Sequence, residues 1–364
     1  MEGSPPSRQF HTLDGLRGVA AVCVAIYHLG AWPRGLTTPL PQAGLAVDMF
    51  FVMSGFVLAH AYQARFDAGM STWRFIGTRI IRLWPLYLLG VAIKLSAIGM
   101  LWVEQGYSSL RNIAVSLLFA LFLLPTPAAW SVDGLPYPFD TPAWSLFYEV
   151  GVNLVWVVLL RRSRPLVLAA ICAVGGAVLL ASGGVTESFA GGAPRVAFSF
   201  FAGILSYLAW RRWPASWRAG PWLAPAALAL AVASFAAPVS PALAPLYRCL
   251  CLALFPVLIW ASAKIETHGR LASALKQCGI ASYAIYVLHD PVLFAAMKLG
   301  WLPASLQTPP FVIALVLLPL VALTPLVDAA FDRPVRRWLQ GRLTRAQALT
   351  AMTGLEGPRE VAAP

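Results

Sequence analysis

Eleven stretches of mostly apolar residues follow one another along the chain, each about as long as the 20 residues that a membrane-spanning helix needs. They cover residues 13–32, 42–62, 83–102, 111–128, 143–160, 165–182, 194–210, 222–240, 242–263, 279–299 and 310–330. None alternates polar and apolar residues as the strands of a membrane β-barrel do. The pattern therefore predicts an all-α fold, a polytopic bundle of helices that span a membrane.

The composition supports a lipid environment. Of the 364 residues, 59% are hydrophobic and 12% are charged, whereas about 25% of the residues of an ordinary globular domain are charged. So few charged groups cannot cover a water-facing surface, and the chain also lacks the polar, aromatic-poor composition of disordered proteins. We expect one membrane domain over residues 13–340, between a cytoplasmic stub at 1–12 and a polar cytoplasmic tail at 341–364.

The basic residues indicate how the chain lies in the membrane. Lys and Arg number 27 against 15 Asp and Glu, and they gather in clusters at 161–164, 211–218 and 333–345 rather than on one polar face. This distribution is typical of cytoplasmic loops and argues against nucleic-acid binding. All three clusters face the cytoplasm if one of the first five stretches fails to cross, and 111–128 is the best candidate because it ends in Pro125-Thr126-Pro127. We therefore predict about ten crossings with both termini in the cytoplasm.

Ionisable side chains inside apolar stretches are costly unless they face a bundle interior or a wet cavity, so each one is a candidate site residue. Arg17 and His28 share the first stretch. On a helix they stand about 16 Å apart along the axis, and eleven positions are close to three full turns, so both point to the same side. The alternatives are an Arg17 that reaches the cytoplasmic headgroups and a His28 capped near the outer surface.

Two further groups have a possible role beside this histidine. Asp48, in the second stretch, would orient the His28 imidazole and stabilise its cationic form, although an aspartate near a helix start also suits the helix dipole. Arg79 and Arg82 lie three positions apart on one helix face and form a fork for phosphate oxygens. A pair of headgroup anchors is the alternative for these arginines.

Later stretches carry their own polar groups. Glu149 has no basic neighbour in sequence, so it must be neutral or paired across the bundle. His289 is a second intramembrane histidine, for which an interhelical hydrogen bond is the alternative to chemistry. Four single charges are expected to find partners or to reach the headgroups, and are assigned no chemistry: Lys94, Arg195, Arg248 and Asp328. The five cysteines have no metal-ligand or redox spacing, and no metal site is predicted.

Taken in order, these segments resemble the membrane-bound acyltransferase 3 family. The matching motifs are Leu13-Asp14-Gly15-Leu16-Arg17-Gly18 with His28, Val47 to Phe56, Arg79/Arg82 with Pro85, Trp144-Ser145-Leu146 to Glu149, Ser282-Tyr283 to His289, and Phe331 to Arg336. Each motif is short, but the ordered set is specific and covers about residues 12–338. One departure is Asp332, where the family usually has Glu.

The resemblance implies a bacterial O-acyltransferase (EC 2.3.1 type) of the cytoplasmic (inner) membrane. It would move an acyl group, acetyl by default, from cytoplasmic acyl-CoA to a hydroxyl of an extracytoplasmic carbohydrate or glycolipid. The CoA phosphates would lie on Arg79 and Arg82, and His28 would act as general base or accept the acyl group itself. The resemblance implies further roles for Arg17 in stabilising donor or oxyanion charge, for Asp48 or Glu149 in orienting His28, and candidate status for Trp144, Ser145 and His289.

Two other classes of protein also contain many apolar helices. A transporter or flippase of a glycan or lipid intermediate would need intramembrane charges and kinked spans, and the chain has 29 prolines. Such a protein usually shows internal repeats with paired broken helices, and no repeat is visible. A non-catalytic scaffold would explain the spans but not the charged residues within them.

Overall fold

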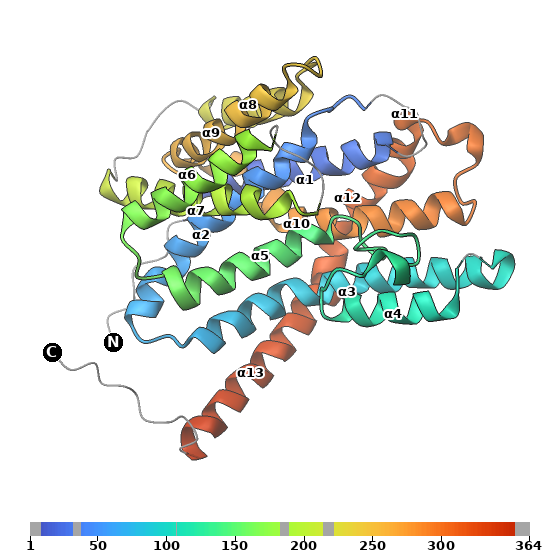
Figure 1. Cartoon of the computed structure of the whole chain (residues 1–364), viewed down its shortest axis with the longest axis horizontal. Helices are drawn as coiled ribbons and strands as arrows, with labels where there is room; N and C mark the ends of the chain where they lie inside the picture. The colour runs from blue at the N-terminus through green and yellow to red at the C-terminus, as the bar shows by residue number, and fades with distance from the viewer. Residues whose placement is uncertain (1–8, 32–37, 107, 183–188, 214–221, 354–364) are drawn as a thin grey trace.

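The structure, a computed structural model, describes residues 9–31, 38–106, 108–182, 189–213 and 222–353. The fold is all-α, as predicted, and Figure 1 shows most helices running along the longest axis of the bundle. The helices are α1 (His11–Ala31), α2 (Ala46–Asp67), α3 (Thr72–Gln105), α4 (Leu110–Leu121), α5 (Ala143–Val155), α6 (Pro165–Ala181), α7 (Gly192–Arg212), α8 (Leu223–Ala236), α9 (Ala244–Ser262), α10 (Gly269–Lys298), α11 (Pro309–Val312), α12 (Leu318–Val327) and α13 (Arg333–Thr353). Short π-helical segments continue α5 and join α11, α12 and α13.

Each of the eleven apolar stretches falls on helix. Among the described residues, seven helices are long and apolar enough to cross a membrane, and three shorter apolar helices accompany them, namely α4, α6 and α8. The protein is thus an integral membrane protein. The number of crossings stays a prediction. Helix α4 has 12 residues and is therefore about 18 Å long, shorter than the hydrocarbon core of a bilayer.

Helices α1 and α10 pack along each other at the centre of the bundle. Two glycines let them approach: a Cβ on Gly18 would lie 2.6 Å from Cβ of Cys278, and a Cβ on Gly279 would lie 2.6 Å from Cβ of Asp14. The residue pairs that meet advance in the same direction on both helices, so α1 and α10 are parallel. This close packing brings polar side chains from the two helices within hydrogen-bonding distance.

A second close packing joins α2 to α7. A Cβ on Gly55 would collide with the backbone carbonyl of Phe200, and a Cβ on Gly203 would collide with that of Val52. Only glycine fits at these two positions without a backbone shift. The α2–α7 packing therefore fixes the charged residues that these helices carry.

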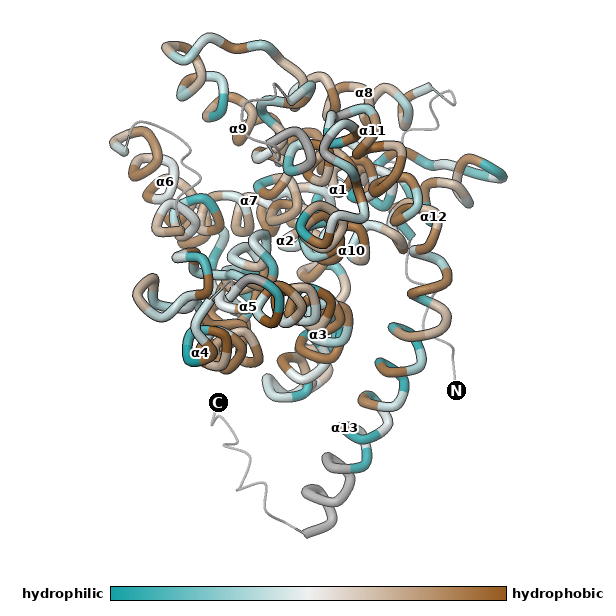
Figure 2. Tube along the Cα trace, turned by 90° about the vertical axis from the view of Figure 1, so that its right-hand side faces the viewer, coloured by the Kyte–Doolittle hydropathy of each residue, from teal (hydrophilic) through white to brown (hydrophobic). Residues whose placement is uncertain are grey.

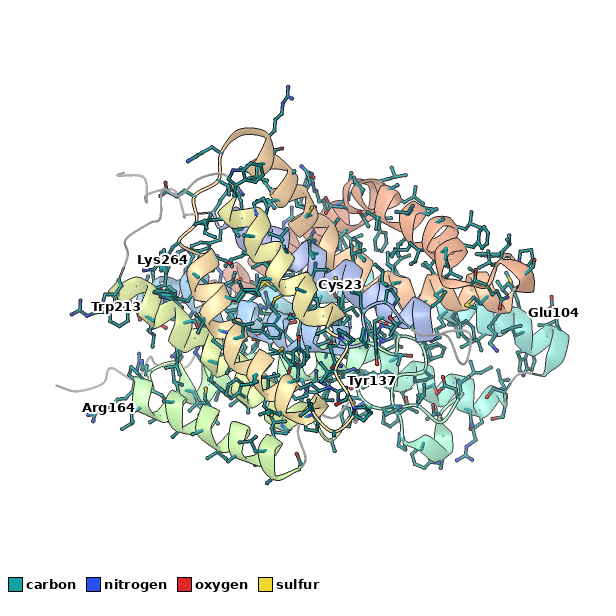
Figure 3. The ribbon with its side chains drawn as sticks, turned by 90° about the horizontal axis from the view of Figure 1, so that it is seen from above. Cys23, Glu104, Tyr137, Arg164, Trp213 and Lys264 are labelled. Carbon is teal, nitrogen blue, oxygen red and sulfur yellow. The ribbon has the colours of Figure 1, made fainter. Side chains whose placement is uncertain are left out.

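The ends of several helices lie together. In Figure 3, Arg164, Trp213 and Lys264 lie at one end of the bundle and Glu104 lies at the opposite end. The basic clusters that follow α5 and end α7 therefore share one end, as the predicted topology requires. Arg218, which belongs to the second cluster, lies outside the described residues. Which end faces the cytoplasm stays a prediction.

Helix α13 extends the last apolar segment beyond the bundle. Figure 2 shows α13 running away from the other helices, with hydrophilic and hydrophobic residues mixed along it. Its Trp338 is 59% exposed. The predicted polar tail thus begins as helix. Of the predicted stub and tail, residues 1–8 and 354–364 lie outside the described residues.

Candidate active site

Arg17 is held between two helices rather than directed to the headgroups. Its Nε donates to Ser282 Oγ at 3.0 Å, and its Nη2 donates to the Gly279 carbonyl at 2.9 Å, both on α10. On its own helix it pairs with Asp14, with Nη2 3.1 Å from Oδ1. The side chain remains 30% exposed. Arg17 is therefore fixed by neutral and acidic partners while part of its guanidinium stays accessible.

Glu149 is paired across the bundle. Arg79 Nη2 on α3 lies 2.6 Å from its Oε1, and Ser54 Oγ on α2 donates to the same oxygen at 3.2 Å. The Arg79 Nε is buried and has no hydrogen-bond partner in the described part of the chain. The ion pair therefore leaves one donor of Arg79 unused.

Arg82 differs from its neighbour because it is exposed and forms no hydrogen bond or ion pair with any described residue. The charges that act on it are Arg79 on the same helix and Arg17, Glu149 and Arg336 on α1, α5 and α13. We call Arg17, Arg79, Arg82 and Arg336 the arginine cluster. Arg17, Arg79 and Arg336 each have a carboxylate partner, whereas Arg82 has none among the described residues, so the cluster is suited to bind an anion at Arg82.

Arg336 also belongs to acidic pairs near the start of α13. It pairs with Asp332, four positions earlier, and lies 3.4 Å from Oδ1 of Asp328. Arg333 Nε lies 2.6 Å from Oδ2 of Asp328. Asp332, which replaces the usual glutamate, thus keeps a basic partner despite its shorter side chain.

A hydroxyl pair lies deeper in the bundle. Ser145 Oγ on α5 is 2.7 Å from the Tyr286 hydroxyl on α10, and Ser145 also donates to the Pro142 carbonyl at 3.0 Å. Both side chains are buried. The neighbouring Trp144 lies against the guanidinium of Arg195, 5.3 Å from its ring centroid. The sequence candidates Trp144 and Ser145 therefore have different surroundings although they are adjacent.

His28 and His289 meet. His289 Nε2 lies 3.2 Å from His28 Nδ1, and His289 is 1% exposed. The same His28 nitrogen is 3.0 Å from the Val24 carbonyl, and His289 Nδ1 is 3.1 Å from the Ile285 carbonyl. We call His28 and His289 the histidine pair. One polar neighbour of His28 is therefore another imidazole, from a helix far along the chain.

Asp48 does not lie beside His28, contrary to the prediction. Arg195 on α7 takes both of its oxygens, with Nε 3.1 Å from Oδ1 and Nη2 2.7 Å from Oδ2, and also donates to the Gly44 carbonyl at 3.0 Å. The Asp48 and Arg195 side chains are 0% and 2% exposed. Glu149 likewise holds Arg79 rather than the imidazole. Neither carboxylate is available to orient His28.

The other single charges have partners, as expected. Lys94 Nζ lies 2.7 Å from Oδ2 of Asp290, which also accepts from the Thr141 backbone N–H at 3.2 Å. Arg248 Nε donates to Gln42 Oε1 at 3.1 Å. These contacts join helices to one another and to the loops, so they account for Lys94, Asp290 and Arg248 without assigning them chemistry.

Asp140, in the loop before α5, is a buried acid that the sequence reasoning missed. Both its oxygens are buried without a hydrogen-bond partner among the described residues. Burial raises the pKa of its carboxyl well above the usual range, Asp290 raises it further and Lys94 lowers it. Burial therefore favours the neutral form of this carboxyl. It follows no helix periodicity, so no sequence signal distinguished it.

Three polar residues of α10 and their partners form a line through the bundle. Ser282, Tyr286 and His289 lie on successive turns of α10, and they contact Arg17, Ser145 and His28 respectively. We call these three residues the polar line. From Ser282 to His289 it rises about 10 Å along the helix. The line connects the arginine cluster to the histidine pair. Within the described residues, no group of three or more His, Cys, Asp or Glu could hold a metal ion.

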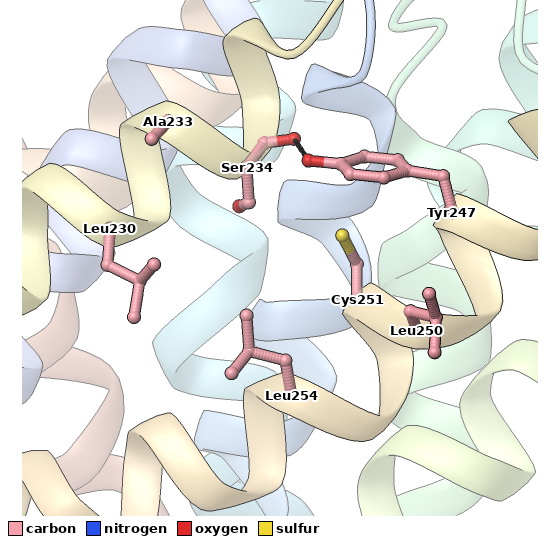
Figure 4. A pocket seen from close by; sticks show the side chains of 7 residues that line it. All are labelled: Leu230, Ala233, Ser234, Tyr247, Leu250, Cys251 and Leu254. Carbon is pink, nitrogen blue, oxygen red and sulfur yellow. Dashed lines mark hydrogen bonds between the residues drawn. The ribbon is translucent and has the colours of Figure 1, made fainter. Parts of the chain in front are cut away.

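An apolar pocket lies apart from this line, between α8 and α9. Figure 4 shows the Tyr247 hydroxyl donating to the Ser234 carbonyl across it, at 2.8 Å. Its lining residues are Leu230, Ala233, Ser234, Tyr247, Leu250, Cys251 and Leu254. No charged side chain lines it, and no predicted site residue belongs to it. The pocket therefore lies outside the predicted site.

Comparison with known families identifies the family of the chain. The family model of acyltransferase 3, described as an acyltransferase domain, matches residues 10–327. The chain therefore belongs to the acyltransferase 3 family, and the protein is an acyltransferase of the EC 2.3.1 type. The match begins just before α1 and ends with α12, so it contains all of the polar line.

Several bacterial proteins are similar in sequence. Protein 2 in the picA locus of Rhizobium radiobacter is 34% identical over 50% of this chain and 97% of its own length. The acyltransferase MdmB of Streptomyces mycarofaciens is 29% identical over 78% of each chain. The peptidoglycan O-acetyltransferase OatA of Listeria monocytogenes is 27% identical over 40% of this chain, which spans only 23% of OatA. No solved structure matches the chain.

Proposed function

We propose that the protein transfers an acyl group from cytoplasmic acyl-CoA to a hydroxyl of a carbohydrate or glycolipid on the other side of the cytoplasmic membrane, with acetyl-CoA as donor. The observation that carries the proposal is the polar line between the arginine cluster and the histidine pair. It provides an anion site at one end of the bundle interior and a basic group at the other. A family relative is a peptidoglycan O-acetyltransferase, which supports a glycan acceptor.

The arginine cluster suits the phosphates of the donor. Arg82 is exposed and unpaired among the described residues, and the buried Arg79 Nε lacks a partner. Guanidinium groups form short, charge-assisted hydrogen bonds with phosphate oxygens. CoA phosphates at this point would supply the negative charge that Arg82 lacks among the described residues. Arg17, directly beside them, would contact the same donor.

The separation of the two ends suits an extended donor. Arg17 and His28 lie eleven positions apart on α1, which corresponds to about 16 Å along the helix. An extended pantetheine arm spans a distance of this order, so phosphates at the arginine cluster would leave the thioester near His28. The same separation means that Arg17 acts on donor charge and does not stabilise an oxyanion formed beside His28.

His28 would then act as general base. It removes the proton from the acceptor hydroxyl, the oxygen attacks the thioester carbonyl, and the carbon–sulfur bond breaks. The proton passes from His28 to the departing CoA thiolate, which leaves as the free thiol. An acyl-His28 intermediate is the second route to the same product, with the imidazole nitrogen attacking first and the acceptor hydroxyl attacking next.

The orientation in the membrane completes the proposal. The basic segments after α5 and at the end of α7 share one end of the bundle, and the positive-inside rule assigns that end to the cytoplasm. Both termini would then be cytoplasmic, with about ten crossings and α4 failing to cross. In this orientation α1 begins at the cytoplasmic side, so the arginine cluster faces the source of acyl-CoA and His28 lies toward the outer side.

The test is a His28→Ala variant in detergent-purified protein, supplied with labelled acetyl-CoA. Loss of a general base should lower acyl transfer and release of free CoA by about 100-fold or more, without changing the unfolding midpoint. His268→Ala is the matched control, because His268 is exposed at the start of α10, and it should keep wild-type activity. Wild-type transfer by His28→Ala would show that the assignment of the base is wrong.

A further inference from the structure

The hydrogen bonds of His289 determine which of its nitrogens carries hydrogen. A backbone carbonyl can only accept, so Nδ1, which lies 3.1 Å from the Ile285 carbonyl, must be the donor. His289 is 1% exposed, and a buried imidazole is held neutral because burying an unpaired charge is costly. A neutral imidazole has one N–H group. Nε2 of His289 therefore presents a lone pair to His28.

His28 faces this lone pair with its own Nδ1. That nitrogen has two acceptors near it, His289 Nε2 at 3.2 Å and the Val24 carbonyl at 3.0 Å. If Nδ1 carried a lone pair, it would point at both acceptors and repel them. Nδ1 of His28 must therefore carry the hydrogen, and in the neutral ring the lone pair belongs to Nε2.

We propose that His289 is a positioning residue for the base: it accepts a hydrogen bond from Nδ1–H of His28, fixes the ring, and keeps the reactive lone pair on His28 Nε2. This inference rests on the proposed role of His28. A catalytic histidine is usually oriented by a carboxylate at its other nitrogen. Here the two candidate carboxylates, Asp48 and Glu149, are engaged elsewhere by Arg195 and Arg79, and a neutral imidazole occupies the orienting position.

His289, as the hydrogen-bond acceptor of His28, also favours the proton transfer from the substrate hydroxyl to His28. When His28 takes a proton from the acceptor hydroxyl, its ring becomes cationic, and a hydrogen bond donated to a neutral base is stronger from a cation than from a neutral ring. The contact therefore stabilises the charge that develops on His28. His289 does not reach the reacting atoms, because its two nitrogens are occupied by Ile285 and His28.

Three substitutions of His289 separate the positioning role from simple packing. Gln places an amide oxygen at the distance of Nε2 and retains an acceptor for His28. Asn places its amide where Nδ1 lies, so it keeps the bond to Ile285 but loses the one to His28. Met fills the space without either bond. Because Met and Gln both fill the space of His289, a role in packing alone would not favour Gln over Met.

The expected order of kcat is wild type, then His289→Gln within a few fold, then His289→Asn and His289→Met about 10-fold or more below wild type, as loss of one hydrogen bond to the base implies. KM for acetyl-CoA should stay unchanged, because the arginine cluster is at the other end of the polar line. Equal kcat for all four proteins would overturn the positioning role. Variants with a lower kcat/KM that comes from a higher KM for acetyl-CoA, with kcat unchanged, would also overturn it.

A second readout does not depend on activity. Nitrogen-15 NMR of histidine-labelled protein in detergent distinguishes the two neutral tautomers, and the chain has only five histidines. The signal that disappears in His28→Ala belongs to His28. It should report Nδ1–H in the wild type and in His289→Gln. In His289→Met the Val24 carbonyl still accepts from Nδ1, so Nδ1–H should persist, but the Nδ1 shift should move because the bond to His289 is lost. A wild-type His28 signal with hydrogen on Nε2 would overturn the inference.

The two proposals fail in different ways. If His28→Ala is inactive while His289→Met retains wild-type kcat and an unchanged His28 Nδ1 shift, only the positioning role is wrong. If His28→Ala keeps wild-type activity, the proposed base is wrong, and the NMR comparison still decides whether His289 fixes the ring.

Discussion

The bundle holds two groups of charged side chains at depth, and they differ in how completely they are paired. In the α2–α7 pair, Asp48 and Arg195 are 0% and 2% exposed, and both carboxylate oxygens accept hydrogen bonds. Between α3 and α5, Arg79 and Glu149 are 11% and 20% exposed, and Arg79 keeps an unpartnered nitrogen. The Asp48–Arg195 pair is fully hydrogen-bonded and buried, so it cannot bind a ligand, whereas the Arg79–Glu149 pair lies beside the exposed Arg82.

This difference separates structural from chemical roles better than depth does. A charge in a low-dielectric interior must be paired to be tolerated. Every such charge is costly, so depth alone does not distinguish a structural role from a chemical one. Only an incompletely satisfied group can gain a new partner when a substrate arrives. Lys94 and Asp290, at 3% and 5% exposure, fall with the structural pair although Asp290 adjoins His289.

Breaking the saturated pair should have the largest effect on stability. Arg195→Met leaves the Asp48 carboxylate buried without a partner, so the free energy of unfolding should fall by about 3–5 kcal/mol. Denaturant titration of the purified protein in detergent measures this. The double variant Asp48→Leu/Arg195→Met removes both charges and should regain most of the loss. A double variant less stable than Arg195→Met would contradict the view that the pair is structural.

Arg82 should behave in the opposite way. Arg82→Ala removes an exposed side chain that has no partner among the described residues, so the free energy of unfolding should change by about 0.5 kcal/mol or less. Loss of one charge-assisted hydrogen bond, worth about 1.5–3 kcal/mol, should raise KM for acetyl-CoA by about 10- to 100-fold. Initial rates over a range of donor concentrations measure this.

Two controls sharpen the Arg82 comparison. Arg74→Ala, at an exposed position earlier on the same helix, should leave KM unchanged, because it lies outside the arginine cluster. Acetyl-pantetheine carries no phosphate, so its KM should be the same for wild type and Arg82→Ala. An equal rise for both donors would mean that Arg82 does not bind phosphate.

Much of the fold could be predicted from local sequence. A run of about 20 apolar residues specifies a membrane helix whatever lies elsewhere in the chain, and all eleven runs are helical. The boundaries were less accurate, because polar residues at helix ends continue the backbone hydrogen bonding. Helix α10, for example, begins at Gly269, ten positions before the apolar run that predicted it.

The pairing of side chains could not be predicted in the same way. Glu149 needed a partner across the bundle, but the choice of Arg79, 70 positions away, depends on how α3 and α5 are rotated. Asp48 looked like a partner for His28 because both are polar and near in sequence. Asp48 pairs with Arg195 instead, because a buried arginine requires a carboxylate. Matching the intramembrane charges by sign would have made Arg195 a candidate partner for Asp48.

The histidine pair depends on the same long-range packing. His28 and His289 are 261 positions apart, and they meet because Gly18 and Gly279 let α1 and α10 approach. The sequence placed Arg17 and His28 correctly on one side of the first helix, since that inference needs only the helical period. It could not identify the opposite helix.

Trp144 gives the smallest predicted effect and tests to which group it belongs. Its ring lies 5.3 Å from the Arg195 guanidinium, so Trp144→Phe should weaken a cation–π contact and lower the free energy of unfolding by about 0.5–1 kcal/mol. KM for acetyl-CoA should not change. In the Arg195→Met background the cation is gone, so the same substitution should cost less, and denaturant titration of the four proteins measures this coupling. An unchanged stability with a higher KM would instead assign Trp144 to the donor site. The fully paired charges would then no longer be purely structural, because a residue that contacts Arg195 would also bind the donor.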